Sequence, residues 1–502
     1  MLRACYNPAM FRNKWALATS SAVLFNLSFL FPSLSFLIWI AFVPMFRLIS
    51  LCHPRVQTAL FSGFIGLVFF SAIFYWIYKY ELRILVLVLC FAAPYFISFS
   101  LFVSLLRKKF NSEILRIFLP ALAWSFVNIL YSLTPVEGLG DLISFYEAAR
   151  FPGLVRIIGT SGVTFLILTF NSLFFEWIKK KSASITIMFV AFLALLLYGK
   201  AAVANLPQMQ PLKVALIQHN FPIDPIWRNE NKQKIMSYYE ETIRNLSGRV
   251  DLIIFPQYGL PVDVLRNPDV FQNLINPTKT SVLLATYLPK IPGGNIDSGE
   301  RTDSALLFTP KQPVQEYQAV TPPPFRRIRQ IRGIERKPLL LTPSPFPLPL
   351  QGGEDKGEGK ISIGVMLCYE DVRAAESKIW IHKGAQFLVS LSNPGHFLKT
   401  HLPNYHFAND RLRAIETGRY IVRVSPNGFS GIIDPNGKVL LKSQLDTAEI
   451  LKGSVYPAER RTIFDRLPVS IHVILAGIFL ILLISMFSLF PKGRGKIMRE
   501  IQ

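Results

Sequence analysis

The stretch ISIGVMLCYED, residues 361–371, shows how the second half of this chain is built. An apolar run ends at Leu367, and Cys368 and Glu370 follow it closely. Such a run predicts a strand that ends in a polar loop, which is where functional side chains tend to lie. Cys368 is therefore a candidate nucleophile at a strand-to-helix turn. The competing interpretation is a small, buried apolar side chain.

Short apolar runs and helical patterns alternate on both sides of this stretch. Residues 232–246 and 405–419 have helical periodicity, and the DPNG sequence at 434–437 is typical of a hairpin turn. Strands that alternate with helices predict a layered α/β domain of about 250 residues. We expect its strands at 214–220, 251–257, 280–288, 304–310, 361–371, 385–393, 420–425 and 431–440.

The rest of the chain is more apolar than a soluble protein. Hydrophobic residues make up 51% of the 502 residues and charged residues only 17%, against about 25% in an average soluble domain. This composition excludes a disordered chain and argues against an ordinary cytosolic enzyme. The net charge of +22 is better explained by basic loops that orient membrane helices than by binding to nucleic acid. The four cysteines form no zinc or disulfide pattern, and we expect neither a metal nor a cofactor.

Eight apolar segments approach the roughly 20 residues that cross a bilayer. They lie at about 15–31, 34–50, 58–78, 84–106, 114–133, 154–177, 184–202 and 468–490. Lys and Arg cluster in every second loop and in the tail, so the positive-inside rule places these loops and both termini in the cytoplasm. We predict a membrane domain at 1–205, an extracytoplasmic domain at 206–460, and a C-terminal membrane helix with a basic tail at 461–502.

Several motifs, taken in order, resemble those of the bacterial apolipoprotein N-acyltransferases, which carry a nitrilase-superfamily domain on a membrane bundle. They are VRIIGTSGVTFLILTFN (155–171), VALIQHNFPID with Trp227 (214–227), LIIFPQYGLP (252–261), DSALLF (303–308), GVMLCYEDV (364–372), LVSLSNPGHF (388–397) and RLRAIETGRYIVRVSPNGFSGIIDPNGKV (411–439). Each motif is weak by itself, but their order and spacing are specific. The resemblance covers nearly the whole chain.

The resemblance implies a nitrilase α-β-β-α sandwich held on the outer face of the bacterial inner membrane. It also implies transfer of a fatty acyl chain from a phospholipid to the diacylglyceryl-cysteine amine of a lipoprotein, through a thioester on Cys368. Tyr369, Glu370 and Trp227 match supporting positions of the family. A phospholipid donor and a lipoprotein acceptor are thus the implied partners of a monomeric chain that needs no cofactor.

The chain departs from the family at two catalytic positions. Gln257 occupies the position of the family's basic Glu, and a neutral amide cannot take a proton from a thiol. Ala319, in EYQAVTPPPFRRIR, stands where the family has a Lys. Lys337 is a candidate for a shifted lysine, and Glu370 is a candidate for a substitute base.

Two loop regions leave alternatives open. Residues 338–360 are rich in Pro and then in Gly and charges, without a helical or strand period, which predicts a surface loop or a lid over the site. Glu137, Asp141 and Glu147 precede the segment at 154–177, and we expect a solvated loop there rather than the rim of a lipid site.

Three functions are compatible with these residues. The first is an apolipoprotein N-acyltransferase that uses Cys368. The second is a catalytically impaired relative that binds lipid or lipoprotein, which Gln257 and Ala319 favour. The third is a membrane-anchored amidase, which has an even greater need of the missing base.

Overall fold

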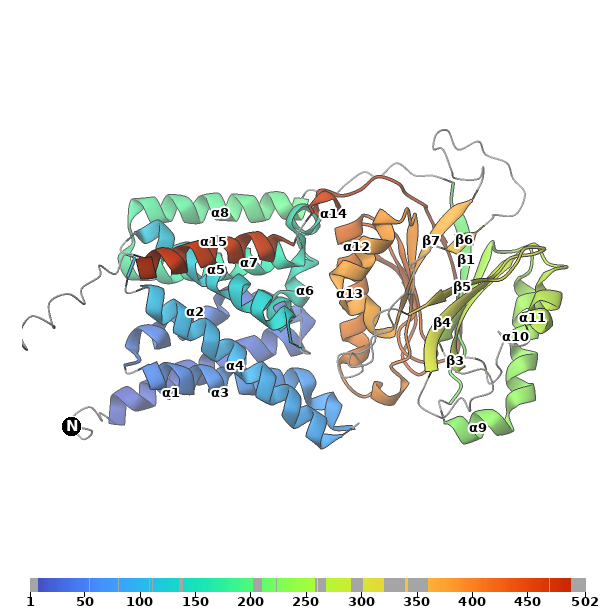
Figure 1. Ribbon diagram of the computed structural model, residues 1–502, viewed down its shortest axis with the longest axis horizontal. Coiled ribbons are helices and arrows are strands. Elements are labelled where there is room, and N and C mark those ends of the chain that lie inside the picture. The colour runs from blue at the N-terminus through green and yellow to red at the C-terminus, as the bar shows by residue number, and fades with distance from the viewer. Residues whose placement is uncertain are drawn as a thin grey trace, which may run out of the picture. The chain divides into compact units, whose positions relative to one another are not determined.

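The computed structural model of the chain divides into two compact units, Met1–Ala202 with Leu467–Gln502, and Val203–Arg466. The second unit is therefore inserted between two helices of the first (Figure 1). The structure describes residues 8–53, 55–79, 81–107, 109–110, 112–134, 139–201, 210–222, 224–257, 260, 268–289, 301–319, 339–341, 360–468 and 470–488.

The first unit is helical wherever the sequence predicts an apolar segment. Its elements are α1 (Pro8–Leu30), η1 (Pro32–Leu37), α2 (Ile38–Leu51), α3 (Arg55–Phe74), η2 (Tyr75–Lys79), α4 (Leu82–Arg107), α5 (Glu113–Ser132), η3 (Leu139–Ile143), α6 (Phe145–Ala148), α7 (Pro152–Lys180), α8 (Ala183–Ala201) and α15 (Ile471–Ser488). Six helices among the described residues are long and apolar enough to cross a membrane. They are Pro32–Leu51, Arg55–Lys79, Leu82–Arg107, Glu113–Ser132, Pro152–Lys180 and Ala183–Ala201, so α1 and α15 stay predictions as membrane spans.

A kink in α7 creates a polar centre within the first unit. Gly159 has φ 69° and ψ 178°, which interrupts the helix and starts a new helical segment after it. Ser161 Oγ and Thr164 Oγ1 each donate to the Asp141 carboxylate at 2.9 Å. His472 Nε2 lies 3.0 Å from Asp141 Oδ1, and its Nδ1 lies 3.1 Å from Ser125 Oγ. These bonds attach α15 to α5, η3 and α7.

The loop before α7 is not solvated as the sequence analysis expected. Glu147 is only 3% exposed, and it accepts hydrogen bonds from Ser35 Oγ at 2.6 Å and Trp39 Nε1 at 2.9 Å. It also pairs with Arg150 at 3.3 Å. The loop packs back onto η1 and α2, because a buried carboxylate needs these partners. Glu137 lies outside the described residues.

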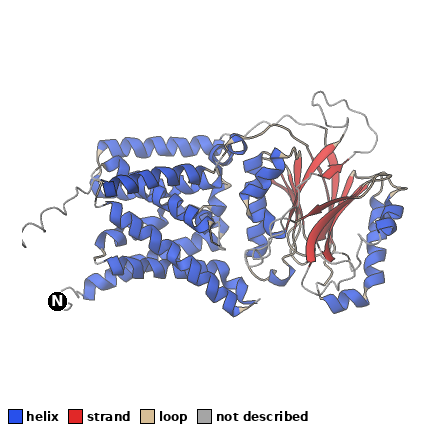
Figure 2. Ribbon diagram, in the orientation of Figure 1, coloured by secondary structure: helices blue, strands red, loops and turns tan. Residues whose placement is uncertain are grey.

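The second unit contains two six-stranded sheets among its described residues, drawn in red in Figure 2. In the first sheet the order is β12 (Glu449–Val455), β1 (Leu212–Gln218), β2 (Leu252–Gln257), β3 (Ser281–Pro289), β4 (Arg301–Phe308) and β5 (Gln315–Gln318). In the second it is β11 (Val439–Lys442), β10 (Gly431–Ile433), β9 (Ile421–Val424), β8 (Phe387–Leu391), β7 (Ile361–Leu367) and β6 (Leu339–Leu341). Each sheet has three parallel central strands with antiparallel strands at its edges.

Helices cover the outer face of each sheet, so the unit has four layers (Figures 1 and 2). The first sheet is covered by α10 (Lys232–Leu246) and α11 (Pro268–Ile275), which share one apolar core with it. The second is covered by α12 (Ala374–His382) and α13 (Leu402–Thr417). A larger apolar core fills the space between the sheets. The predicted α-β-β-α sandwich is therefore confirmed.

The predicted helix and hairpin are confirmed where helical periodicity or turn residues mark them clearly in the sequence. Helix α10 has the bounds predicted for it, and β10 and β11 form the predicted hairpin, in which the Gly437 N–H donates to Asp434 O at 2.9 Å. One expectation was wrong: Leu339–Leu341, at the start of the low-complexity region, form β6. This strand pairs antiparallel with β7, so the apolar LLL sequence is used to extend the sheet. Residues 342–359 lie outside the described part of the chain.

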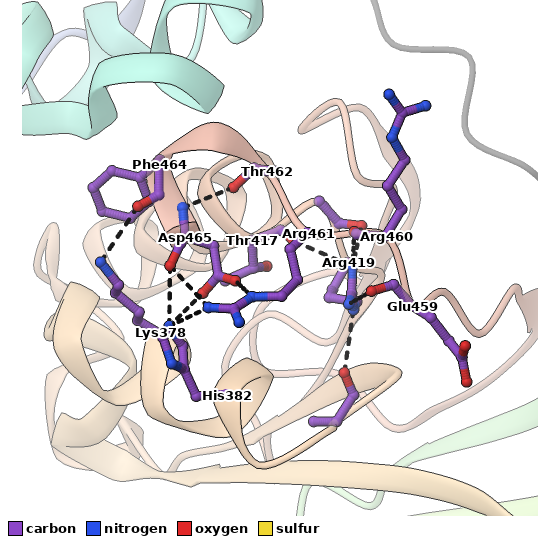
Figure 3. A network of polar contacts seen from close by, with 12 residues as sticks. Lys378, His382, Thr417, Arg419, Glu459, Arg460, Arg461, Thr462, Phe464 and Asp465 are labelled. Atoms are coloured by element: carbon purple, nitrogen blue, oxygen red, sulfur yellow. Dashed lines mark hydrogen bonds and ion pairs between the residues drawn. The ribbon is translucent and has the colours of Figure 1, made fainter. Parts of the chain in front are cut away.

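The segment that follows β12 is tied to the α12 and α13 layer by a polar network (Figure 3). Arg419 donates to Arg460 O at 2.7 Å and to Glu459 O at 2.9 Å, and it reaches back to Ala385 O. Asp465, in α14 (Ile463–Arg466), is buried and pairs with Arg461 and His382 in the same network. The network therefore attaches α14 to the layer of α12 and α13.

Gly364 in β7 offers a test of the packing beneath the second sheet. An added Cβ would lie 2.6 Å from Leu388 Cδ2 and 2.9 Å from Trp380 Cβ. We expect Gly364→Ala to lower the free energy of unfolding of this unit by about 1–3 kcal/mol, because neighbours in a packed core must move. Urea unfolding of the full chain in detergent measures the change. Gly477→Ala in α15, where nothing lies within 4 Å, is the matched control. Equal midpoints for the two variants would contradict the prediction.

Candidate active site

Cys368 lies on a sharp turn between β7 and η5 (Cys368–Val372). Its φ of 51° falls in the left-handed region, which costs an L-residue with a Cβ about 1–2 kcal/mol. Backbone strain of this kind is concentrated at functional sites, where it aims a side chain away from the strand. The residue keeps partial exposure, whereas all seven residues of β7 are buried.

The surroundings of Cys368 keep its thiol protonated. Burial raises the pKa of this thiol to about 12, and the negative charges of Asp303 and Asp371 add to the increase. The Tyr369 N–H and the Arg423 guanidinium oppose it. Since the thiolate is the reactive form of cysteine, a reaction at this site needs a group that removes the proton during attack.

Glu370 stabilises the turn through hydrogen bonds. It is fully buried, and both of its carboxylate oxygens lie 2.9 Å from Tyr317 Oη, which donates to them. The backbone N–H of Leu367, the residue before the cysteine, also donates to Glu370 at 2.9 Å. Glu370 therefore connects β5 of the first sheet to the end of β7 in the second.

A buried charge network lies beside the same turn. Arg423 Nη1 donates to Asp371 Oδ2 at 2.9 Å and to Asp410 Oδ2 at 2.7 Å, and its other terminal nitrogen donates to Ser392. His406 Nδ1 lies 2.8 Å from the Asp371 carboxylate. The network joins η5, α13, β8 and β9.

The two carboxylates of this network are held differently. Burial alone would raise the pKa of Asp371, but His406 and Arg423 together bring it below its ordinary value. Burial dominates at Asp410 and raises its pKa to about 6, although Arg423 opposes this. Asp371 is therefore ionised at neutral pH, and Asp410, with a pKa of about 6, is mostly ionised as well.

The two residues that the sequence analysis places at the family's Glu and Lys positions both lie on the inner side of the first sheet. Gln257, the last residue of β2, is fully buried and pairs with Ala285, which belongs to the core between the sheets. Ala319 directly follows β5 and packs against the same core. Neither residue can carry charge, and Lys337 lies outside the described residues.

Trp227 lies in a different layer from these residues. It belongs to α9 (Pro225–Glu230), stacks near Phe221 with ring centroids 6.0 Å apart, and packs against the core shared by the first sheet and α10. That core is on the outer face of the first sheet. The described contacts of Trp227 therefore stabilise the domain rather than the cysteine turn.

Asp303, Asp371 and Arg423, whose charges act on the Cys368 thiol, were not singled out from the sequence. Arg423 carried a signal, because a charge inside the apolar run IVRV needs buried partners. Asp371 was visible beside Glu370, and Asp303 opens the DSALLF motif. Among the described residues, no group of three or more His, Cys, Asp and Glu side chains is placed to hold a metal ion.

Two family models match this chain in the regions described above. The carbon-nitrogen hydrolase model matches residues 213–463, and the model of the apolipoprotein N-acyltransferase N-terminal domain matches residues 21–173. The chain belongs to the apolipoprotein N-acyltransferase family. The resemblance found in the sequence is therefore confirmed over both units.

Relatives in this family match at low identity over most of their length. The apolipoprotein N-acyltransferase of Geobacter metallireducens is 25% identical over 491 residues, which is 91% of this chain and 92% of that protein. The enzyme of the same name from Rickettsia prowazekii is 25% identical over 452 residues, with 85% and 86% covered. Saccharomyces cerevisiae Nit3, a solved member of the nitrilase superfamily, has a TM-score of 0.36 and 17% identity, and covers 51% of this chain and 93% of its own.

The protonated thiol predicts a steep pH dependence for chemical modification of this family member. The rate of Cys368 alkylation by iodoacetamide should rise about tenfold per pH unit from pH 7 to 10 without a plateau, because the thiol pKa is about 12. Peptide mass spectrometry measures the rate at this residue. The urea-unfolded chain is the control, in which the same cysteine should level off near the ordinary pKa of about 8.5. A plateau near pH 8.5 in the folded protein would refute a raised pKa.

The Arg423 network predicts a large loss of stability when the guanidinium is removed. Arg423→Met leaves Asp371 and Asp410 buried without their cation, so we expect the free energy of unfolding to fall by about 3–5 kcal/mol. Adding Asp410→Asn should restore part of this loss, because one of the two charges disappears. Urea unfolding measures both variants, with the exposed Arg466→Met as control. A loss no larger than that of Arg466→Met would rule out the assigned role.

Proposed function

We propose that this protein transfers a fatty acyl chain from a phospholipid to the N-terminal amine of a lipoprotein. The observation that carries the proposal is Cys368, on a strained turn at the end of β7, in a carbon-nitrogen hydrolase domain attached to the N-terminal domain of apolipoprotein N-acyltransferases. Two curated relatives that match this chain over most of their length are named apolipoprotein N-acyltransferase.

Two acyl-transfer steps use the same sulfur. The Cys368 sulfur attacks the ester carbonyl of the phospholipid as a base removes its proton, and the lysophospholipid leaves with that proton. The amine of the lipoprotein cysteine then attacks the thioester, loses a proton to the base, and returns the thiol. In this scheme Glu370 and Tyr369 keep the turn in shape, and Trp227 supports the fold of the domain.

The proposal places the α/β unit outside the cytoplasm. Lys and Arg are concentrated in the loops that the positive-inside rule assigns to the cytoplasm, together with both termini. The membrane is then the bacterial inner membrane, where the phospholipid donor and the lipoprotein acceptor meet. We propose that the protein acts as a monomer.

A second candidate function follows from the two neutral positions. Gln257 and Ala319 favour a relative that binds lipid or lipoprotein without acyl transfer, because neither residue supplies a base or a cation. An amidase is less well supported, since amide hydrolysis at Cys368 needs the same base.

Acyl transfer is tested with the full chain in phospholipid nanodiscs and a synthetic diacylglyceryl lipopeptide. We expect an N-acylated lipopeptide and a hydroxylamine-sensitive acyl group on Cys368, both lost in Cys368→Ser. Mass spectrometry measures both species. Cys90→Ser is the matched control, because it makes the same change in helix α4 of the membrane unit and should leave the product unchanged.

The same assay separates the alternatives. A wild-type chain that binds the lipopeptide but forms neither thioester nor N-acylated product would favour the non-catalytic function. Release of ammonia from short amides, without transfer to the lipopeptide, would favour an amidase.

A further inference from the structure

The proposed acyl transfer needs a base that the expected position does not supply. Gln257 is neutral, and the Cys368 thiol is protonated at rest. The carboxylates that follow the cysteine are already engaged. Glu370 accepts hydrogen bonds from Tyr317 and Leu367, and Asp371 is held by Arg423 and His406. These bonds stabilise the ionised carboxylates and so weaken both as bases.

Asp303 brings a carboxylate to the inner side of the first sheet. It lies in β4, and the next residues of the same parity, Ala305 and Leu307, belong to the core between the two sheets. Because side chains alternate along a strand, Asp303 is on that inner side as well. The N–H of Ala319 donates to Asp303 O at 2.8 Å, which places the two residues side by side across the β4 and β5 ladder.

The inner side of β5 reaches the cysteine turn. Tyr317 pairs with Ala305 in the ladder, points into the core between the sheets, and donates to Glu370 two residues after Cys368. Asp303 precedes Ala305 by two residues in β4 and lies beside Ala319, just after the end of β5. The charge of Asp303 also raises the pKa of the Cys368 thiol, in agreement with this placement.

We propose that Asp303 is the general base that takes the proton of Cys368 during acyl transfer, directly or through one water. The assignment rests on the proposed function. It replaces the missing Glu by a carboxylate from a neighbouring strand of the same sheet, beside the position where the family has its Lys.

Asp303 takes up and releases one proton in each of the two steps of the reaction. As the sulfur bonds to the ester carbonyl carbon, the thiol proton moves to Asp303, and the departing glycerol oxygen of the phospholipid takes it up. In the second step the lipoprotein amine bonds to the thioester carbon and loses its proton to Asp303. The departing sulfur receives that proton, which restores both groups.

The other charged groups at this place set the direction of the pH response. Asp371 and Glu370 come from η5, and Arg423 comes from β9, where it is bonded to Asp371 and Asp410. Gln257 of β2 adds no charge. Burial, with the charges of Asp303 and Asp371, keeps the thiol protonated, so turnover depends on proton removal during the attack rather than on a resting thiolate.

The test measures single-turnover formation of the Cys368 thioester by the full chain in phospholipid nanodiscs, between pH 6 and 10. We expect Asp303→Asn to slow the reaction by about 10²–10⁴-fold at pH 7. The remaining rate should rise about tenfold per pH unit, because hydroxide then removes the proton. Adding Gln257→Glu should restore the rate to within about tenfold of the wild type, since it returns a carboxylate to the family's position.

Glu316→Gln is the matched control. Glu316 lies on β5 opposite Leu306, whose side chain belongs to the core on the outer face of the sheet, so its carboxylate points away from Cys368. It should leave the rate and its pH profile unchanged.

Each other outcome has a defined meaning. A folded Asp303→Asn that forms the thioester at the wild-type rate overturns the assignment but keeps the proposed function. A slow variant with an unchanged pH profile and no rescue by Gln257→Glu means a structural role, which also overturns it. No thioester in the wild type overturns the proposed function itself. If Asp303→Asn does not fold, Asp303→Glu replaces it: retained thioester formation supports a carboxylate base, and its loss overturns one.

Discussion

Both faces of the two sheets are covered, and this single constraint determines where charge can lie in the α/β unit. All residues of β7 and β9 are buried, so a polar group must either stand where a strand ends or have its charge matched nearby. Cys368 meets the first condition and Arg423 the second. Because the guanidinium bonds to Asp371 and Asp410, the turn after β7, helix α13 and strand β9 are held by one group.

The chemistry around Cys368 differs from what its family membership alone suggests. A Glu and a Lys would make the site a mixture of charges, whereas the described residues near the sulfur are mainly carboxylates. Arg423, the cation among them, is shared between two aspartates and is set in the core. The site therefore favours a neutral Cys368 thiol, and Gln257 and Ala319 add no charge to its surroundings.

The sequence could predict the elements whose patterns are local. Helix α10, strand β7 and the hairpin at Asp434 follow from periodicity and turn chemistry within a dozen residues. Strand β12 was not predicted, because it forms by pairing with β1, which lies more than two hundred residues earlier. The same applies to the site: Cys368 is marked by its own strand, whereas Asp303 and Tyr317 reach it only through the pairing of β4 with β5 and the stacking of two sheets.

The protonated thiol has a further consequence for the lifetime of the protein. Oxidation to sulfenic acid and exchange with disulfides both begin from the thiolate, so a cysteine held as the neutral thiol reacts slowly with peroxides and with disulfide-forming enzymes. Outside the cytoplasm, where the proposed function places this unit, the environment is oxidising and exposed low-pKa cysteines are consumed. Burial, together with the charges of Asp303 and Asp371, thus protects the Cys368 sulfur from oxidation.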